Sequence, residues 1–132
     1  MANESFEVSA MIPASPERVY AAWLDGEEHS RMTGGGATGR PEVGAAFTAW
    51  DDYISGRNLE LAPGERIVQS WRTTQFPKSA KDSRVEVALE AVEGGTKLTL
   101  SHTEIADGRG KSYESGWVDH YFEPMKAYFA QK

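Results

Sequence analysis

The strongest structural signal in the chain is its closing segment, residues 112–130, which reads SYESGWVDHYFEPMKAYFA. Large side chains recur there at four-residue steps, the spacing of one helix face: Tyr113, Trp117, Tyr121 and Met125. The segment holds six of the fourteen aromatic residues of the chain. A helix with so many rings needs a broad apolar partner, so the pattern predicts an amphipathic helix packed on a sheet.

One residue interrupts this helix. Pro124 has no backbone N–H to donate to the carbonyl of His120, and its ring crowds the preceding turn. We therefore predict a kink between His120 and Pro124.

The middle of the chain, residues 42–103, predicts the sheet. Its segments alternate apolar and polar residues, and the connections between them are too short for a crossover helix, so the strands must be antiparallel. Glu93-Gly94-Gly95 predicts a tight hairpin turn. The positions that define the expected strands are Val43, Ala45 and Phe47; residues 53–61; Ile67, Gln69 and Trp71; Val85, Val87 and Leu89; and Leu98, Leu100 and His102.

The first third of the chain predicts a strand followed by two helices. Residues 5–12 alternate as a half-buried strand does, and Ser15-Pro16 is typical of a capped helix start. That helix should run to Leu24, with a second helix over residues 27–32. The glycine-rich stretch 33–41 lacks the Lys and Ser/Thr of a phosphate-binding loop, so we interpret it as an edge loop.

Composition excludes several classes of protein. The chain has 132 residues, a net charge of −6 and no cysteine, which excludes disulfides, thiol catalysis and cysteine-based zinc sites. Its basic residues are scattered, which argues against nucleic acid as a partner. The absence of an 18-residue apolar run or a signal-like N-terminus predicts no membrane span and a cytoplasmic location. We expect one domain, residues 1–132.

Several short segments of the sequence resemble segments of one protein family. Residues 8–20 (VSAMIPASPERVY) resemble its opening strand and capped helix, and Pro63 with residues 66–71 (RIVQSW) its fourth strand. Residues 94–102 (GGTKLTLSH) resemble its last hairpin, and Gly116-Trp117 its closing helix. Together they are similar to the SRPBCC (START-like) superfamily, and most like its branch of heat-shock-protein-90 ATPase activators.

The resemblance implies an α+β helix-grip fold. In that fold a curved antiparallel sheet of six to seven strands wraps around a long C-terminal helix, with two short helices after the first strand. Many relatives hold an apolar small molecule between sheet and helix. The leading hypothesis is therefore non-enzymatic binding of a small hydrophobic or aromatic ligand. The alternatives are a protein-interaction module that modulates a chaperone ATPase, and a cyclase- or hydrolase-type enzyme that uses His102.

Five residues are candidates for lining the ligand cavity. They are aromatic or imidazole side chains that this fold would bring together: Phe47, Trp71, His102, Trp117 and Tyr121. His102 shares the parity of Leu98 and Leu100 and so faces the core, where it serves either as a structural hydrogen-bonding group or as an acid or base. His29, His102 and His120 lack the spacing of a metal site, so we expect neither a metal nor a cofactor.

The cost of an empty cavity limits what this interior can contain. A dry apolar void of about 300 Å³ would cost roughly 7 kcal/mol, which rivals the whole stability of a small domain, about 5 to 15 kcal/mol. A large cavity must therefore be partly polar and wet, filled by a ligand, or absent. His102, Tyr121 and Asn58 are the inward polar candidates.

Overall fold

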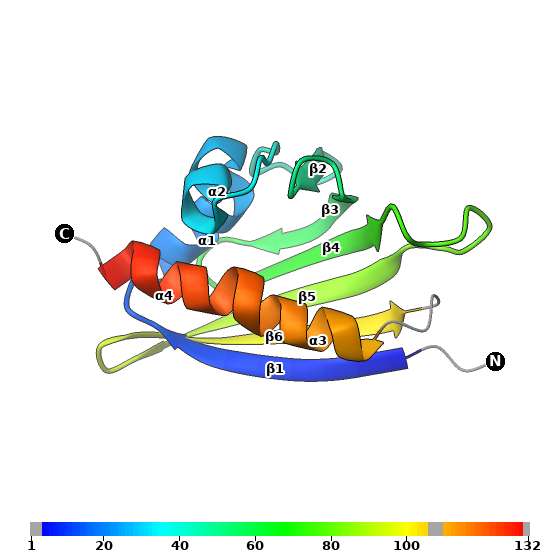
Figure 1. Cartoon of the computed structure of the whole chain (residues 1–132). Coiled ribbons are helices and arrows are strands. Elements are labelled where there is room, and N and C mark those ends of the chain that lie inside the picture. Colours follow the sequence, from blue (N-terminus) through cyan, green and yellow to red (C-terminus); the bar gives the residue numbers. More distant parts are fainter. Residues whose placement is uncertain (1–3, 106–109, 131–132) are drawn as a thin grey trace.

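The computed structural model describes residues 4–105 and 110–130, and within them a curved antiparallel sheet is crossed by a C-terminal helix (Figure 1). This is the predicted α+β helix-grip arrangement. The described sheet has six strands in the order β1-β6-β5-β4-β3-β2. Their bounds are β1 Glu4–Ile12, β2 Ala46–Ala49, β3 Ile54–Ala62, β4 Arg66–Thr73, β5 Ser83–Val92 and β6 Gly95–Ile105. The predicted hairpin is present, because β5 and β6 pair in register from Arg84↔Thr103 to Val92↔Gly95.

Two short helices follow β1, as predicted. α1 spans Pro16–Leu24, and the Ser15 hydroxyl caps it by accepting a hydrogen bond from the backbone N–H of Arg18 at 3.2 Å. α2 spans Gly26–Thr33 and ends at Gly34, whose φ of 88° suits glycine. α2 packs between β2 and the end of the C-terminal helix.

The β2 strand lies later in the chain than predicted. It begins at Ala46, so Val43 and Ala45 precede it and the side chain of Val43 is exposed. The reason is a local turn: Gly44 has a φ of 86°, and its N–H donates to the carbonyl of Asn58. This turn ends the regular alternation before the strand begins.

The closing helix is continuous but irregular. α3 spans Gly110–Trp117, a π-helical turn, η1, spans Val118–Phe122, and α4 spans Glu123–Ala130. The N–H of Glu123 donates to the carbonyl of Val118, five residues back. Where the sequence predicts a kink, the helix has a π-helical turn just before Pro124, and the kink itself stays a prediction. None of the helices within the described ranges is long and apolar enough to cross a membrane.

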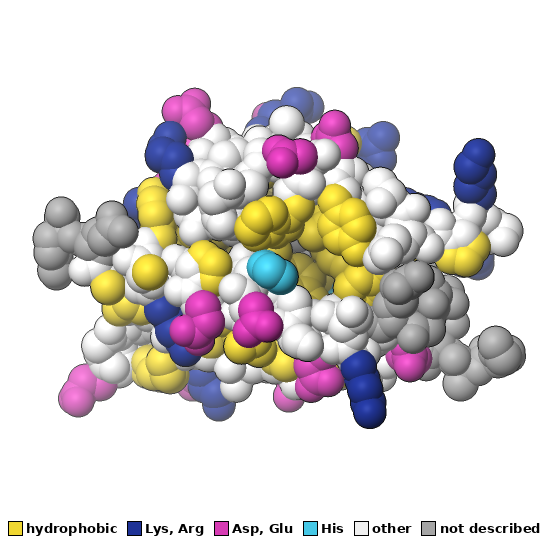
Figure 2. Space-filling model, viewed as in Figure 1, with side chains coloured by type: hydrophobic (Ala, Val, Ile, Leu, Met, Phe, Trp, Pro, Cys, Tyr) yellow, Lys and Arg dark blue, Asp and Glu magenta, His cyan; other side chains and the backbone are white. Residues whose placement is uncertain are grey.

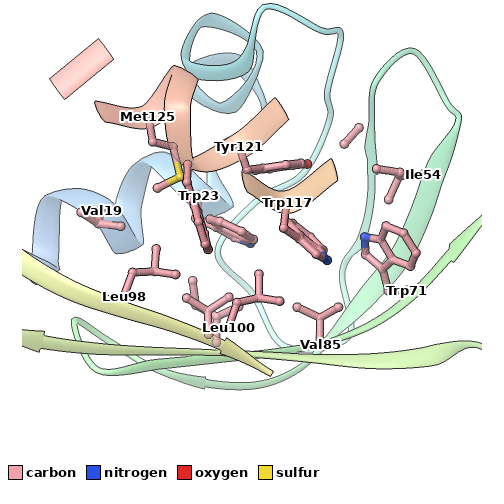
Figure 3. Packing of buried hydrophobic residues seen from close by; sticks show 14 of the residues in the cluster. Val19, Trp23, Ile54, Trp71, Val85, Leu98, Leu100, Trp117, Tyr121 and Met125 are labelled. Carbon is pink, nitrogen blue, oxygen red and sulfur yellow. The ribbon is translucent and has the colours of Figure 1, made fainter. Parts of the chain in front are cut away.

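The core lies between the sheet and the closing helix. Figure 3 shows Leu98, Leu100 and Val85 rising from the sheet toward Trp117, Tyr121 and Met125 of the helix. Val19 and Trp23 of α1 close the same layer.

A chain of hydrogen bonds inside this core ties the helix to the sheet. The indole N–H of Trp117 donates to Nδ1 of His102 at 3.1 Å, and Nε2 of His102 lies 2.7 Å from the hydroxyl of Ser83. The Ser83 hydroxyl donates to the carbonyl of Trp71 at 2.9 Å. These partners assign the proton to Nε2, because Nδ1 must accept from the indole. His102 is therefore a neutral, fully paired imidazole.

Burial makes protonation of this imidazole costly. His102 has no exposed surface, and its burial lowers the pKa to about 3. A proton on Nδ1 would also face the indole N–H of Trp117. His102 therefore takes up a proton in the unfolded chain and stays neutral in the folded one.

We predict that replacing Ser15 with alanine lowers the free energy of unfolding by about 1 kcal/mol, because the first turn of α1 loses its capping acceptor. Urea denaturation measures the change. Ser79→Ala, in the exposed β4–β5 connection, is the matched control and should change stability by less than about 0.5 kcal/mol. Equal effects of the two substitutions would refute the cap.

A second prediction concerns pH. Because the folded pKa of His102 lies below that of the unfolded chain, the unfolded state binds the extra proton, and stability falls as pH decreases from about 6.5 toward 3. His102→Gln should be less stable at pH 7, yet lose stability between pH 6 and 4 more slowly than the wild type, by about 1 kcal/mol per pH unit. Urea denaturation at several pH values gives both slopes, and identical slopes would contradict a neutral buried His102.

Candidate functional site

One pocket of about 270 Å³ opens on the surface between the closing helix and the turn that joins β2 to β3. Figure 2 shows the hollow, with hydrophobic side chains around it and a histidine at its edge. Its lining is almost wholly apolar and mostly aromatic: Trp50, Tyr53, Ile54, Trp71, Tyr113, Gly116, Trp117, His120 and Tyr121.

The inner wall consists of buried rings from the sheet and the helix. The ring centroid of Trp117 lies 5.7 Å from that of Trp71 and 4.7 Å from that of Tyr121. Trp71 also meets Tyr113 edge to face at 5.0 Å. Figure 3 shows Tyr121, Trp117, Trp71 and Ile54 side by side along this wall. Each ring is held by others, so the wall is preorganised.

The hydroxyls of Tyr121 and Tyr113 are bonded within the protein. The Tyr121 hydroxyl lies 3.0 Å from Nε2 of His29, whose Nδ1 lies 2.8 Å from the carbonyl of Trp23. The Tyr113 hydroxyl pairs with that of Thr73 at 2.9 Å. Across the described residues, no buried side-chain nitrogen or oxygen lacks a hydrogen-bond partner. The pocket therefore offers ring surface to a ligand rather than buried hydrogen-bonding groups.

Burial also fixes the protonation of the His29–Tyr121 pair. It lowers the pKa of His29 and raises the pKa of Tyr121, so both are neutral near pH 7. The carbonyl of Trp23 takes the proton of Nδ1, and the Tyr121 hydroxyl therefore donates to Nε2. This arrangement orients the Tyr121 ring and gives it no nucleophilic or basic character.

The rim of the pocket is a strained turn. Trp50, Asp51 and Asp52 have φ values of 51°, 56° and 76°, a conformation that a tryptophan adopts rarely. The Trp50 indole and the exposed imidazole of His120 meet edge to face, with ring centroids 5.6 Å apart. The strained turn thus holds Trp50 over the pocket, against the helix.

The glycine-rich loop supports this turn. The N–H of Gly36 donates to the carboxylate of Asp51 at 3.0 Å, and the N–H of Asp51 donates to the carbonyl of Gly36 at 2.9 Å. A Cβ on Gly35 would lie 2.3 Å from the Trp50 ring. The loop is therefore an edge loop, as predicted, and glycine is needed at position 35 so that the indole can pack against it.

Three of the five candidate lining residues line this pocket: Trp71, Trp117 and Tyr121. Phe47 is half-buried and lines a neighbouring space of only about 10 Å³. His102 lies behind the wall, with its ring centroid 4.6 Å from that of Trp71. Both of its ring nitrogens are already paired, so it supports the wall from within the core.

Asn58 is buried as predicted and lies beneath the loop that precedes β2. Its amide donates to the carbonyls of Arg40 and Glu42 at 3.0 Å and accepts from Gln69 at 2.9 Å. Gln69 in turn accepts from the indole N–H of Trp23 at 3.2 Å. This polar group therefore positions a loop and a strand.

Sequence reasoning missed six lining residues: Trp50, Tyr53, Ile54, Tyr113, Gly116 and His120. One signal was available for two of them, because Trp50 and Tyr53 are aromatic residues that flank the acidic turn at Asp51-Asp52. Nothing in the sequence marked Gly116 as a lining residue, although a glycine at this position leaves the pocket open.

Among the described residues, no group of three or more His, Cys, Asp or Glu side chains is placed to hold a metal ion. The buried imidazoles are neutral and paired, and the wall consists of rings.

Comparisons with known proteins agree with the fold. The chain is 27% identical to an "Activator of 90 kDa heat shock protein ATPase homolog" of Dictyostelium discoideum, over 97% of this chain and 33% of that protein. It is 22% identical to the "Activator of 90 kDa heat shock protein ATPase homolog 2" of Mus musculus, over 92% of this chain and 37% of that protein. The chain thus spans about a third of the length of these curated relatives.

Solved structures show the same architecture. An HSP90 activator from Plasmodium falciparum superposes with a TM-score of 0.86 at 24% identity, covering 96% of each chain. The protein CalU16 of Micromonospora echinospora superposes with a TM-score of 0.78 at 23% identity, covering 96% of this chain and 76% of that one. The family described as "Activator of Hsp90 ATPase homolog 1-like protein" matches residues 13–130. The chain therefore belongs to this family.

Proposed function

We propose that the chain, acting as one domain, binds a small apolar or aromatic molecule in the aromatic pocket without transforming it. The observation that carries this proposal is the lining itself. An open pocket of about 270 Å³ has three tryptophans and three tyrosines in its wall, and the indole N–H of Trp117 and the hydroxyls of Tyr113 and Tyr121 are bonded within the protein.

Water is a poor occupant of such a pocket. At about 30 Å³ per molecule the space corresponds to roughly nine waters, and the wall provides them with almost no hydrogen-bond partners. A ligand with an apolar surface releases these waters to bulk solvent, which is favourable. Because the mouth is open, solvent enters the pocket when the ligand is absent. The protein therefore does not bear the free-energy cost of an empty apolar cavity.

The shape of the wall favours a ring in the ligand. Aromatic pairs contribute about 0.5–1.5 kcal/mol beyond the area they bury, and the wall offers rings at several tilts to one another. The volume lies just below the usual range for small-molecule sites, about 300–1,000 Å³. The ligand is therefore small, with about one or two rings.

A pocket-filling substitution gives the sharpest test. A Cβ at Gly116 would have the imidazole of His120 as its nearest neighbour, at 4.0 Å, so a larger side chain can enter the pocket without a backbone clash. We predict that Gly116→Leu weakens binding of a small aromatic ligand at least tenfold. The measurement is a tryptophan-fluorescence titration with a panel of one- and two-ring compounds.

Gly116→Ala is the matched control. It fills little of the pocket and replaces a helical glycine, so it should bind nearly as the wild type does and be about 0.5–1 kcal/mol more stable. If no compound in the panel binds the wild type saturably, the proposal fails. Equal affinities of the wild type and Gly116→Leu would place binding elsewhere.

A second candidate function is modulation of the ATPase of the 90 kDa heat-shock chaperone. It is supported by the family and by the names of the two relatives, which are activators of that ATPase. The chain covers about a third of each, so the activity of those whole proteins is a hypothesis for this chain. The two functions are compatible, because the pocket occupies only one face of the sheet.

An ATPase assay tests this second function. If the chain modulates the chaperone, its addition at saturating concentration should change the chaperone's rate of ATP hydrolysis severalfold, and the two should co-elute. The Gly116→Leu variant is an informative comparison. If the docking surface lies outside the pocket, the chaperone should hydrolyse ATP at the same rate with the variant as with the wild type. No association and no change in rate would refute this function.

A further inference from the structure

We infer that the ligand of the aromatic pocket is a small organic cation, whose apolar or aromatic body enters the pocket while its positive charge stays at the mouth. This inference rests on the proposed function and narrows its ligand class. It follows from the rings at the mouth, from the charges beside them, and from the volume.

The mouth presents aromatic surface. Trp50 is half-buried, and Tyr53 is 36% exposed, whereas Trp71, Trp117 and Tyr121 are buried. A cation is attracted to the face of an aromatic ring, most strongly to tryptophan. A ligand whose charged end reaches Trp50 and Tyr53 therefore keeps that end partly hydrated and still in contact with rings.

Three acidic residues adjoin lining residues in the sequence. Asp51 and Asp52 lie on the turn between Trp50 and Tyr53, and Asp119 adjoins His120 on the helix. All three are exposed. Figure 2 shows Asp and Glu side chains on two sides of the hollow, with Lys and Arg side chains farther out. This pattern attracts a cation to the mouth and repels an anion.

Within residues 4–105 and 110–130, no lysine or arginine lines the pocket. The basic residue nearest to the lining in sequence is Arg72, which follows Trp71 on β4 and therefore points to the opposite face of the sheet. Its guanidinium is paired there with Asp82 at 2.8 Å and donates to the carbonyls of Ala80 and Pro77. Its charge is thus directed away from the pocket and is balanced.

The volume limits the cation to a small one. A space of about 270 Å³ holds one ring system and not the two acyl chains of a membrane lipid. A ring-bearing amine or quaternary ammonium ion of low mass fits both the size and the charge.

Three isosteric probes test the charge preference. Benzyltrimethylammonium is the cation, neopentylbenzene is its neutral carbon isostere, and 2,2-dimethyl-3-phenylpropanoate is the anion. Tryptophan-fluorescence titration at about 0.1 M ionic strength keeps screening to a length of about 10 Å. We expect the cation to bind about five- to tenfold more tightly than the neutral probe, and the anion more weakly than either.

Charge-removing variants locate the effect. Asp52→Asn with Asp119→Asn should weaken the cation about twofold and leave the neutral probe unchanged. Asparagine suits position 52, because it tolerates a positive φ. The control removes two exposed carboxylates at the far β5–β6 hairpin, Glu90→Gln with Glu93→Gln, and should change neither affinity.

The outcomes separate the two proposals. Equal binding of cation and neutral probe, or tighter binding of the anion, overturns the charge inference and leaves the ligand-binding function standing. Unchanged cation affinity in the Asp52/Asp119 variant overturns the role of these carboxylates and with it the inference. If none of the three probes binds saturably, the proposed function fails and the inference falls with it.

Discussion

The hydrogen-bond chain from Trp117 through His102 to Ser83 fixes how the closing helix sits on the sheet. Each of these groups is buried, and a buried donor or acceptor without a partner costs about 1–3 kcal/mol. Rotating or sliding α3 would separate the indole N–H from Nδ1 and incur that cost. Apolar packing alone tolerates small shifts of a helix, whereas this contact specifies one position.

The pocket is a consequence of that position. The indole N–H of Trp117 bonds to His102 and the hydroxyl of Tyr121 bonds to His29, both within the core. The remaining surface of the two rings faces the space beside the helix. The π-helical turn then supplies both a wall residue and a rim residue, because it places Tyr121 inside and His120 outside. Trp50, supported by Gly35, meets His120 from the opposite side and completes the mouth.

The sequence predicted the features that depend on local periodicity. The bounds of α1 follow from Ser15-Pro16 and the apolar spacing after it, and the inward side of His102 follows from its parity with Leu98. The order of the elements also followed from these patterns, and the resemblance to the family supplied the way in which the sheet wraps around the closing helix. Each of these patterns involves only a few residues that are close together in the sequence.

What could not be predicted depends on contacts between distant residues. The start of β2 is set by Gly44 and Asn58, fourteen positions apart, and the place of Trp50 by its contact with Gly35. The partners of His102 come from β5 and α3, so the choice between a structural and a catalytic imidazole could not be made from the sequence. Tyr53 and Gly116 line the pocket only because the sheet curves around the helix.

The most direct measurement of this account is the protonation of His102 and the exchange of the Trp117 indole proton, observed together by nitrogen-15 NMR at neutral pH. The account predicts a neutral ring protonated on Nε2, an unprotonated Nδ1, and an indole N–H that exchanges slowly with solvent. A ring protonated on Nδ1, or an indole proton that exchanges as fast as an exposed one, would contradict it.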